Sequence, residues 1–168
     1  MRRSTRIAEL VYIGVGSNLG NRPSFLESAR DLVQKLPATR FLRSSQVHET
    51  DPVGGPPQGK FLNAVWEIET RLPPVELKDR LLQIEEKLGR KRTVQNAPRE
   101  IDLDILFYGD RVVQGPGLEI PHPRLHERLF VLVPLAELVP DKTHPQLKKL
   151  VRQLLYLKSG EPPKVSSL

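Results

Sequence analysis

The 168-residue sequence contains no cysteine. That absence excludes disulfide bonds, thiolate nucleophiles and zinc sites built on thiolates, and it is compatible with a reducing cytosol. No apolar run approaches the roughly 18 residues that span a bilayer. The basic residues 1–6 are not followed by the apolar segment of a secretory signal. We therefore expect a cytoplasmic protein without a membrane partner.

Other residue types and motifs that are scarce or absent limit the functions that the chain can have. Aromatic residues make up only 5% of the chain, which leaves few platforms on which bases of a nucleic acid could stack. The pattern G-x-x-x-x-G-K-[ST] is absent, which excludes a P-loop kinase. The four histidines have no ligand spacing, so a histidine metal site is not expected. The net charge of +6 nevertheless favours an anionic partner, either a nucleic acid or a phosphorylated small molecule.

Hydrophobic spacing predicts one α+β domain. The elements expected are strands at 10–15, 41–49, 61–70 and 101–108 and helices at 25–36 and 73–89. The order strand-helix-strand-strand-helix-strand is typical of a ferredoxin-like sandwich, an antiparallel sheet with helices on one face. A short strand at 111–114 and two or three short helices between 124 and 156 are expected to follow. We expect a single domain over 10–158, with flexible termini at 1–9 and 159–168.

The glycines near the first predicted strand do not form a dinucleotide-binding motif. Gly14, Gly16 and Gly20 give the spacing G-x-G-x-x-x-G, and the position of the third motif glycine is Leu19. We interpret them as a tight strand-to-helix turn.

The predicted strand 101–108 carries the most informative pattern. Side chains alternate faces along a strand, so Asp102 and Asp104 point one way while Ile101, Leu103 and Ile105 point the other. Two carboxylates about 7 Å apart on one strand face repel each other unless a cation lies between them. Magnesium fits this pair because it takes one or two protein carboxylates and keeps its other positions for water and phosphate.

Taken alone, the two aspartates are better explained as the solvated face of an edge strand. The segment directly before the strand reverses that preference. Arg90, Lys91, Arg92 and Arg99 place cations beside the paired acids, where they would meet a polyphosphate. The combination indicates a metal-dependent phosphoryl-transfer site.

Two further segments carry candidate binding groups. Phe61 and Asn63 combine an aromatic face with a side-chain amide, the parts needed to stack a flat heterocycle and bond its edge. They follow the loop 50–59, whose three prolines and three glycines exclude regular structure and favour a functional loop. His122 lies between two prolines near Arg124 and Arg128, so it could present a donor to phosphate.

Six segments, in this order, resemble the 6-hydroxymethyl-7,8-dihydropterin pyrophosphokinase family. They are VGSNLG at 15–20, TDPVG at 50–54, FLNA at 61–64, LGRKR at 88–92, APREIDLDI at 97–105 and IPHP at 120–123. The resemblance covers about residues 10–141. It implies transfer of pyrophosphate from ATP to the hydroxymethyl oxygen of the pterin, with release of AMP, in folate synthesis.

The resemblance also implies roles for individual residues. Asp102 and Asp104 would hold two magnesium ions, and Arg90 and Arg92 would lie on a catalytic loop that closes over the triphosphate. The expected ATP-binding residues are Glu85, Arg99, His122 and Arg128. The expected pterin-binding residues are Phe61 and Phe130, which would sandwich the ring, Asn63, which would bond its edge, and the backbone at Thr50 and Val53. Many members carry an arginine and a tryptophan where this chain has Gln95 and Asn96.

Three alternatives remain open on sequence grounds. A ferredoxin-like RNA-binding module would fit the basic charge, but the Gly-aromatic-Gly-aromatic motif of such modules is absent. A nucleotidyltransferase could use the same paired aspartates and release pyrophosphate, and a pterin kinase would release ADP. The preferred interpretation has ATP and the pterin as partners, with no nucleic acid. No pattern marks a subunit interface, so we expect a monomer.

Overall fold

The computed structural model describes residues 7–52, 55, 57–89 and 100–160. Val53, Arg90, Arg92 and Arg99, predicted for the site, lie outside these residues, as do Gln95 and Asn96. The elements run in the order β1 (Glu9–Ser17), α1 (Arg22–Gln34), β2 (Thr39–Ser44), β3 (His48–Thr50), β4 (Phe61–Thr70), α2 (Pro74–Lys87), β5 (Asp102–Tyr108), β6 (Val113–Gly115), β7 (Leu118–Ile120), the 3₁₀ turn η1 (Leu125–Glu127), α3 (Leu129–Leu138) and α4 (Val151–Ser159). No helix in the described ranges is both long and apolar enough to cross a bilayer.

The main sheet is antiparallel, with the order β2-β4-β1-β5, as the α+β ferredoxin-like prediction requires. The predicted strand 41–49 is divided into β2 and β3, which pair one after the other with β4. The division occurs at Ser45, whose Oγ accepts a hydrogen bond from the backbone N–H of Val65 at 2.8 Å. Because a side chain takes the place of a ladder carbonyl there, the chain leaves β2 and re-enters the sheet as β3.

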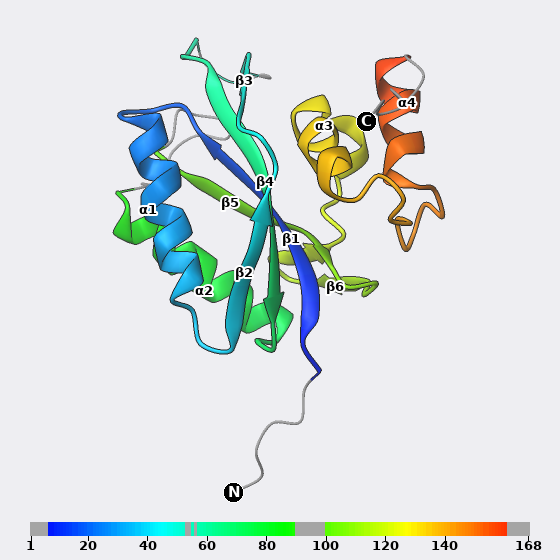
Figure 1. Cartoon of the computed structure of the whole chain (residues 1–168), viewed down its shortest axis with the longest axis horizontal. Helices are drawn as coiled ribbons and strands as arrows, with labels where there is room; N and C mark the ends of the chain where they lie inside the picture. The colour runs from blue at the N-terminus through cyan, green and yellow to red at the C-terminus, as the bar shows by residue number, and fades with distance from the viewer. Residues whose placement is uncertain (1–6, 53–54, 56, 90–99, 161–168) are drawn as a thin grey trace, which may run out of the picture.

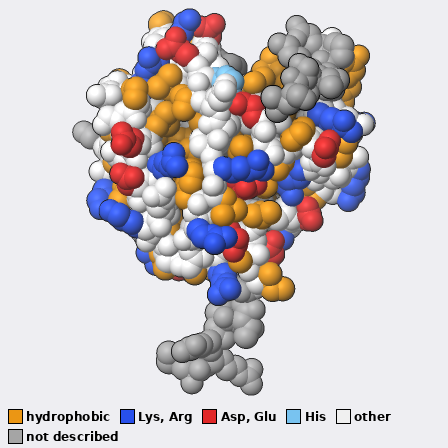
Figure 2. Space-filling model, in the orientation of Figure 1, with side chains coloured by type: hydrophobic (Ala, Val, Ile, Leu, Met, Phe, Trp, Pro, Cys, Tyr) orange, Lys and Arg blue, Asp and Glu red, His pale blue; other side chains and the backbone are white. Residues whose placement is uncertain are grey.

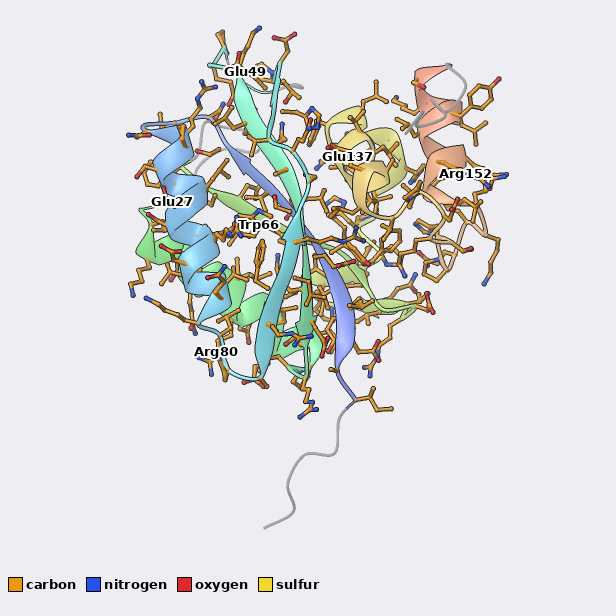
Figure 3. All side chains as sticks on the ribbon, viewed as in Figure 1. Glu27, Glu49, Trp66, Arg80, Glu137 and Arg152 are labelled. Atoms are coloured by element: carbon orange, nitrogen blue, oxygen red, sulfur yellow. The ribbon has the colours of Figure 1, made fainter. Side chains whose placement is uncertain are left out.

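Helices cover both faces of the sheet (Figure 1). On one face α1 and α2 pack against a core that includes Val11, Ile13 and Trp66; Figure 3 labels Trp66 between the sheet and these helices. On the other face α3 and α4 cover Val65 and Phe107. The predicted sandwich had helices on one face only. Because the C-terminal helices close the second face, β4 is buried along nearly its whole length.

An ionic cluster around the buried carboxylate of Glu67 attaches α3 to the sheet. Glu67 of β4 accepts hydrogen bonds from Arg43 Nε at 2.9 Å, from Arg43 Nη2 at 3.2 Å and from the Tyr12 hydroxyl. Arg43 Nη2 also donates to the carbonyl of Leu138, the last residue of α3, at 2.9 Å. Burial alone would raise the pKa of Glu67, but the hydrogen bonds from Arg43 and Tyr12 and the charge of Arg43 lower it below its ordinary value.

Glu67→Gln should therefore destabilise the protein by about 1–3 kcal/mol at pH 7, the usual cost of losing hydrogen bonds to a charged group. A carboxyl with a lowered pKa contributes stability above its unfolded-state pKa and loses it as the pH falls through the folded-state value. The difference between wild type and variant, measured by urea unfolding, should thus shrink below about pH 4. The control is Glu69→Gln, on the same strand, which loses only an exposed pair with Arg40 at 3.4 Å. That change should cost less than about 1 kcal/mol. A difference for Glu67→Gln that does not vary with pH would contradict the ionic role.

Candidate active site

A cavity of about 670 Å³ opens between the sheet and α3. It brings together eight of the predicted site residues from distant parts of the chain, namely Thr50, Phe61, Asn63, Asp102, Asp104, His122, Arg128 and Phe130. They come from β3, β4 and β5, the start of α3 and the segment between β7 and α3. Clustering of residues chosen from separate sequence motifs supports the choice of site, because the sheet alone does not require them to share one cavity.

The two aspartates lie on β5 as the alternation predicts. Asp102 and Asp104 line the cavity, whereas Leu103 and Ile105 are buried in the core under α1 and α2. Burial, and secondly the charge of Asp102, raise the pKa of Asp104 to about 7. The negative charge of Asp102 thus disfavours the ionised form of Asp104, and a divalent cation would reverse that effect.

The donor set fits magnesium with phosphate as co-ligand. Among the described residues, no group of three or more histidine, cysteine, aspartate or glutamate side chains could enclose a metal ion. A pair of carboxylates beside an open cavity is what Mg²⁺ uses when substrate phosphates and water supply its other ligands. Asp102 and Asp104 are therefore suited to a metal that arrives together with a phosphorylated substrate.

The floor of the cavity is made by two glycines of β1. Gly16 is opposite Asp102 and Gly14 is opposite Asp104 in the β1–β5 register. A Cβ on Gly16 would lie 3.0 Å from Asn63 Oδ1, and one on Gly14 would lie 3.2 Å from Leu106 Cδ2. The interpretation of these two glycines as turn residues is wrong, because both lie within β1. The signal that could have identified them is their spacing of two, which places both on the same strand face.

An aromatic wall and an amide stand at one side of this floor. Phe61 and Asn63 are buried on β4, and Phe130 lines the cavity from the first turn of α3. Asn63 Nδ2 donates to the hydroxyl of Thr50, which fixes the amide with its Oδ1 toward Gly16. Arg128 lies with its guanidinium carbon 5.5 Å from the centre of the Phe130 ring. The arrangement offers two aromatic side chains and a held amide to a flat polar ring.

The loop before β4 is attached near this wall. Asn18 Nδ2 donates to Gln58 Oε1 at 2.7 Å and to the carbonyl of Gly59 at 3.1 Å. Arg22 Nη1 donates to the carbonyl of Lys60 at 2.8 Å. These bonds hold the C-terminal end of the loop against the start of α1, and Gln58 in turn lines the cavity.

His122 is held as a neutral imidazole. Its Nδ1 accepts a hydrogen bond from the backbone N–H of Arg124 at 3.1 Å, which assigns the ring proton to Nε2. Burial, and secondly the charge of Arg128, lower the pKa of His122 to about 4. At neutral pH the ring can therefore donate one hydrogen bond to a phosphate oxygen without itself carrying a charge.

Glu85 lies behind the aspartates and not on the cavity wall. It is buried on α2, and its Oε2 accepts a hydrogen bond from the backbone N–H of Leu103 at 2.7 Å. Leu103 is the residue between Asp102 and Asp104, so Glu85 fixes the strand that carries both carboxylates. Its predicted contact with ATP stays a prediction.

A second cavity, of about 290 Å³, lies on the other side of Asp104. Its lining combines residues of α2, β5, the β6–β7 hairpin and the segment after β7, namely Lys78, Asp104, Ile105, Gly115, Gly117, Leu118, Glu119, His122 and Pro123. Asp104 and His122 line both cavities. One carboxylate of the pair, that of Asp104, thus borders both cavities, which suits a reaction that joins two substrates. The hairpin was not among the segments that the sequence predicted for the site.

Comparison with known proteins extends these findings. The profile of the family described as 7,8-dihydro-6-hydroxymethylpterin-pyrophosphokinase (HPPK) matches residues 12–140. The 2-amino-4-hydroxy-6-hydroxymethyldihydropteridine pyrophosphokinase of Bacillus subtilis (strain 168) is 46% identical over 129 residues, which is 77% of this chain and 77% of the relative. The protein of the same name from Pseudomonas aeruginosa is 39% identical over 140 residues, which is 83% of this chain and 86% of the relative.

Solved structures of Plasmodium falciparum HPPK-DHPS share the fold. One, the triple mutant S436F/A437G/A613T with pteroate, superimposes with a TM-score of 0.73 at 16% identity and covers 90% of this chain. The match spans only 43% of the Plasmodium chain. At that identity the likeness concerns the arrangement of strands and helices and not the site.

Proposed function

This chain belongs to the 7,8-dihydro-6-hydroxymethylpterin-pyrophosphokinase family, an ATP-dependent enzyme family of folate biosynthesis, and we propose how its residues divide the work. The observation that carries the proposal is the position of Asp102 and Asp104 on the wall of the larger cavity, with Asp104 also lining the smaller one. The larger cavity has the aromatic and amide groups that suit a pterin. The smaller one, on the far side of Asp104, would take the nucleoside part of ATP.

The chemistry is an in-line displacement at the β-phosphorus of ATP. The hydroxymethyl oxygen of the pterin forms a bond to that phosphorus and gives up its proton to water. The bond from phosphorus to the oxygen bridging the α- and β-phosphates breaks, and AMP leaves with that oxygen. We propose that Asp102 and Asp104 hold two magnesium ions. When bound there, magnesium would neutralise the phosphate oxygens as charge develops on them.

The protein groups around the carboxylates would position the phosphates. His122 Nε2–H and the Arg128 guanidinium line the larger cavity beside Asp102, so both can donate to phosphate oxygens. Arg90, Arg92 and Arg99, which lie outside the described residues, are proposed on the resemblance alone as the cations that cover the triphosphate. The rate increase would come mainly from the positioning of the reacting groups and from electrostatic stabilisation of the transition state, as in other phosphoryl transfers.

The pterin would lie between Phe61 and Phe130, with the Asn63 amide against its hydrogen-bonding edge. Burial of Asn63 supports this role, since an amide that is 6% exposed and held by Thr50 presents its oxygen in one orientation. Backbone groups at Thr50 and Val53 are proposed to complete recognition. We further propose that residues 10–158 form the single catalytic domain, that it acts as a monomer, and that it works in the cytoplasm.

A product assay tests the proposal. The protein is incubated with ATP, magnesium and 6-hydroxymethyl-7,8-dihydropterin, and AMP, ADP and pyrophosphate are resolved. AMP formed in equal amount to pterin diphosphate is the expected result. Pyrophosphate as product would favour a nucleotidyltransferase, and ADP a simple pterin kinase. No product, together with magnesium-independent binding of RNA, would favour the RNA-binding alternative.

Acidic and basic side chains are interspersed over the face drawn in Figure 2, as expected for a surface that does not bind a polyanion.

A further inference from the structure

Lys78 stands out in the smaller cavity. It is a half-buried residue of α2, and it is the single lysine or arginine among the described residues that line this space. None of the ion pairs formed within the described ranges includes it. A lysine that is partly withdrawn from water, and that pairs with no acidic group among the described residues, can offer its charge to an anion.

Lys78 lines the smaller cavity together with Asp104 and His122, the two residues that this cavity shares with the larger one. The side chain of Lys78 therefore borders the same space as the two residues at which the cavities meet. The rest of the lining includes Leu118 and Pro123, whose apolar surfaces suit a flat base better than a phosphate.

The order of base, ribose and phosphates in a nucleotide then determines which of these groups lies near Lys78. If the β-phosphate has to reach the larger cavity past Asp104 while the base stays among apolar residues, the α-phosphate lies at the junction between the cavities. We propose that Lys78 binds the α-phosphate, first of ATP and, after transfer, of AMP. This inference rests on the proposed function, and it names a phosphate-binding residue on α2 that does not belong to the arginine segment.

The test compares AMP with adenosine, which lacks the phosphate. Binding of each to wild type, Lys78→Met and Lys78→Arg is measured by calorimetry with magnesium present. Lys78→Met should weaken AMP binding roughly tenfold, the usual effect of losing one charge-assisted hydrogen bond, and leave adenosine binding unchanged. Lys78→Arg, which keeps the charge, should restore AMP affinity to within about threefold of wild type.

The control is Arg80→Met. Arg80 lies on the same helix but at its periphery, where it forms a half-exposed pair with Glu76 at 3.7 Å (Figure 3). Its replacement removes one positive charge without touching the cavity, so AMP affinity should change less than twofold at physiological salt. An equal loss for Lys78→Met and Arg80→Met would mean that only net charge matters, and it would overturn the inference.

Two other results would overturn it. One is an unchanged AMP affinity in Lys78→Met, and the other is an equal loss for AMP and adenosine, which would place Lys78 beside the base. The product assay on wild type separates this inference from the function. If wild type makes pterin diphosphate and AMP while Lys78→Met binds AMP normally, the role of Lys78 fails and the proposed reaction stands. If wild type forms no such product, the proposed function fails first.

Discussion

Asp104→Asn should lower turnover by roughly 10²–10³, the usual cost of losing one preorganised electrostatic group in an active site. Asparagine has nearly the same shape but no charge to hold a cation against the phosphates. Asp102→Asn should behave similarly, because both carboxylates face the same cavity. The loss should appear in the product assay at saturating ATP and magnesium.

In the absence of metal, Asp104→Asn should stabilise the folded protein although it lowers turnover. A carboxyl whose folded-state pKa is raised contributes stability below its unfolded-state pKa, and this contribution is lost as the pH rises toward the folded-state value. For Asp104 that interval runs from about pH 4 to about pH 7. Without metal, Asp104→Asn should therefore become more stable relative to wild type as the pH rises through this interval. Urea unfolding at several pH values, in the presence of a chelator, measures the difference.

Asp110→Asn is the matched control for the aspartate variants. Asp110 lies two residues beyond the end of the same strand, where its exposed side chain pairs with Lys142 at 3.2 Å. Its replacement removes the same charge from the same segment and should leave turnover within about twofold of wild type. Full activity in Asp104→Asn would contradict the assignment of Asp104 to the metal, and an unfolded variant would contradict the expected gain in stability.

The aspartate pair could be predicted because its geometry is local. Alternation along a single strand is sufficient to place Asp102 and Asp104 together, and no knowledge of the rest of the chain is needed. The same applies to β4, which begins and ends where its apolar and β-branched residues predict. The hydrophobic periodicity of a single strand or helix can be predicted from the sequence. Tertiary contacts decide which face of the element is buried, but they do not change the period.

Other features depend on contacts between distant segments, so the sequence could not specify them. The helix α3 is apolar on nearly all sides, and its sequence does not indicate that it covers the second face of the sheet. The smaller cavity exists only because the β6–β7 hairpin lies beside β5 and α2. The role of Glu85 was likewise hidden, since a carboxylate that binds the backbone of Leu103 looks in sequence like any glutamate of an amphipathic helix.

The glycines of β1 show why absence of a side chain can define a binding site. Gly16→Ala should weaken pterin binding roughly tenfold or more, whereas Gly14→Ala should change it only a few-fold. Both substitutions add one methyl group on the same face of the same strand. They differ in the neighbour that has to move, and a neighbour that is hydrogen-bonded moves at a greater cost than one that is only packed.

At Gly16 the new Cβ would lie 3.0 Å from Asn63 Oδ1, and Asn63 is itself held by the hydroxyl of Thr50. The methyl group would push the amide away from the position in which we propose that it meets the pterin. At Gly14 the nearest atom, 3.2 Å away, is Cδ2 of Leu106, the end of an apolar side chain that has no hydrogen bond to lose. Stability should change little in either variant, because alanine favours a strand more than glycine does and offsets part of the crowding.

The affinity of each variant for the pterin is measured by calorimetry with a non-hydrolysable ATP analogue and magnesium, and thermal unfolding checks the fold. Equal affinities for the two variants would show that Asn63 can move freely, and its proposed part in reading the pterin edge would be wrong. A larger loss in Gly14→Ala would place the ring over Leu106 instead. The expected order requires that the pterin lie against the Asn63 side of the glycine floor, next to Phe61, with its hydroxymethyl group toward the aspartates.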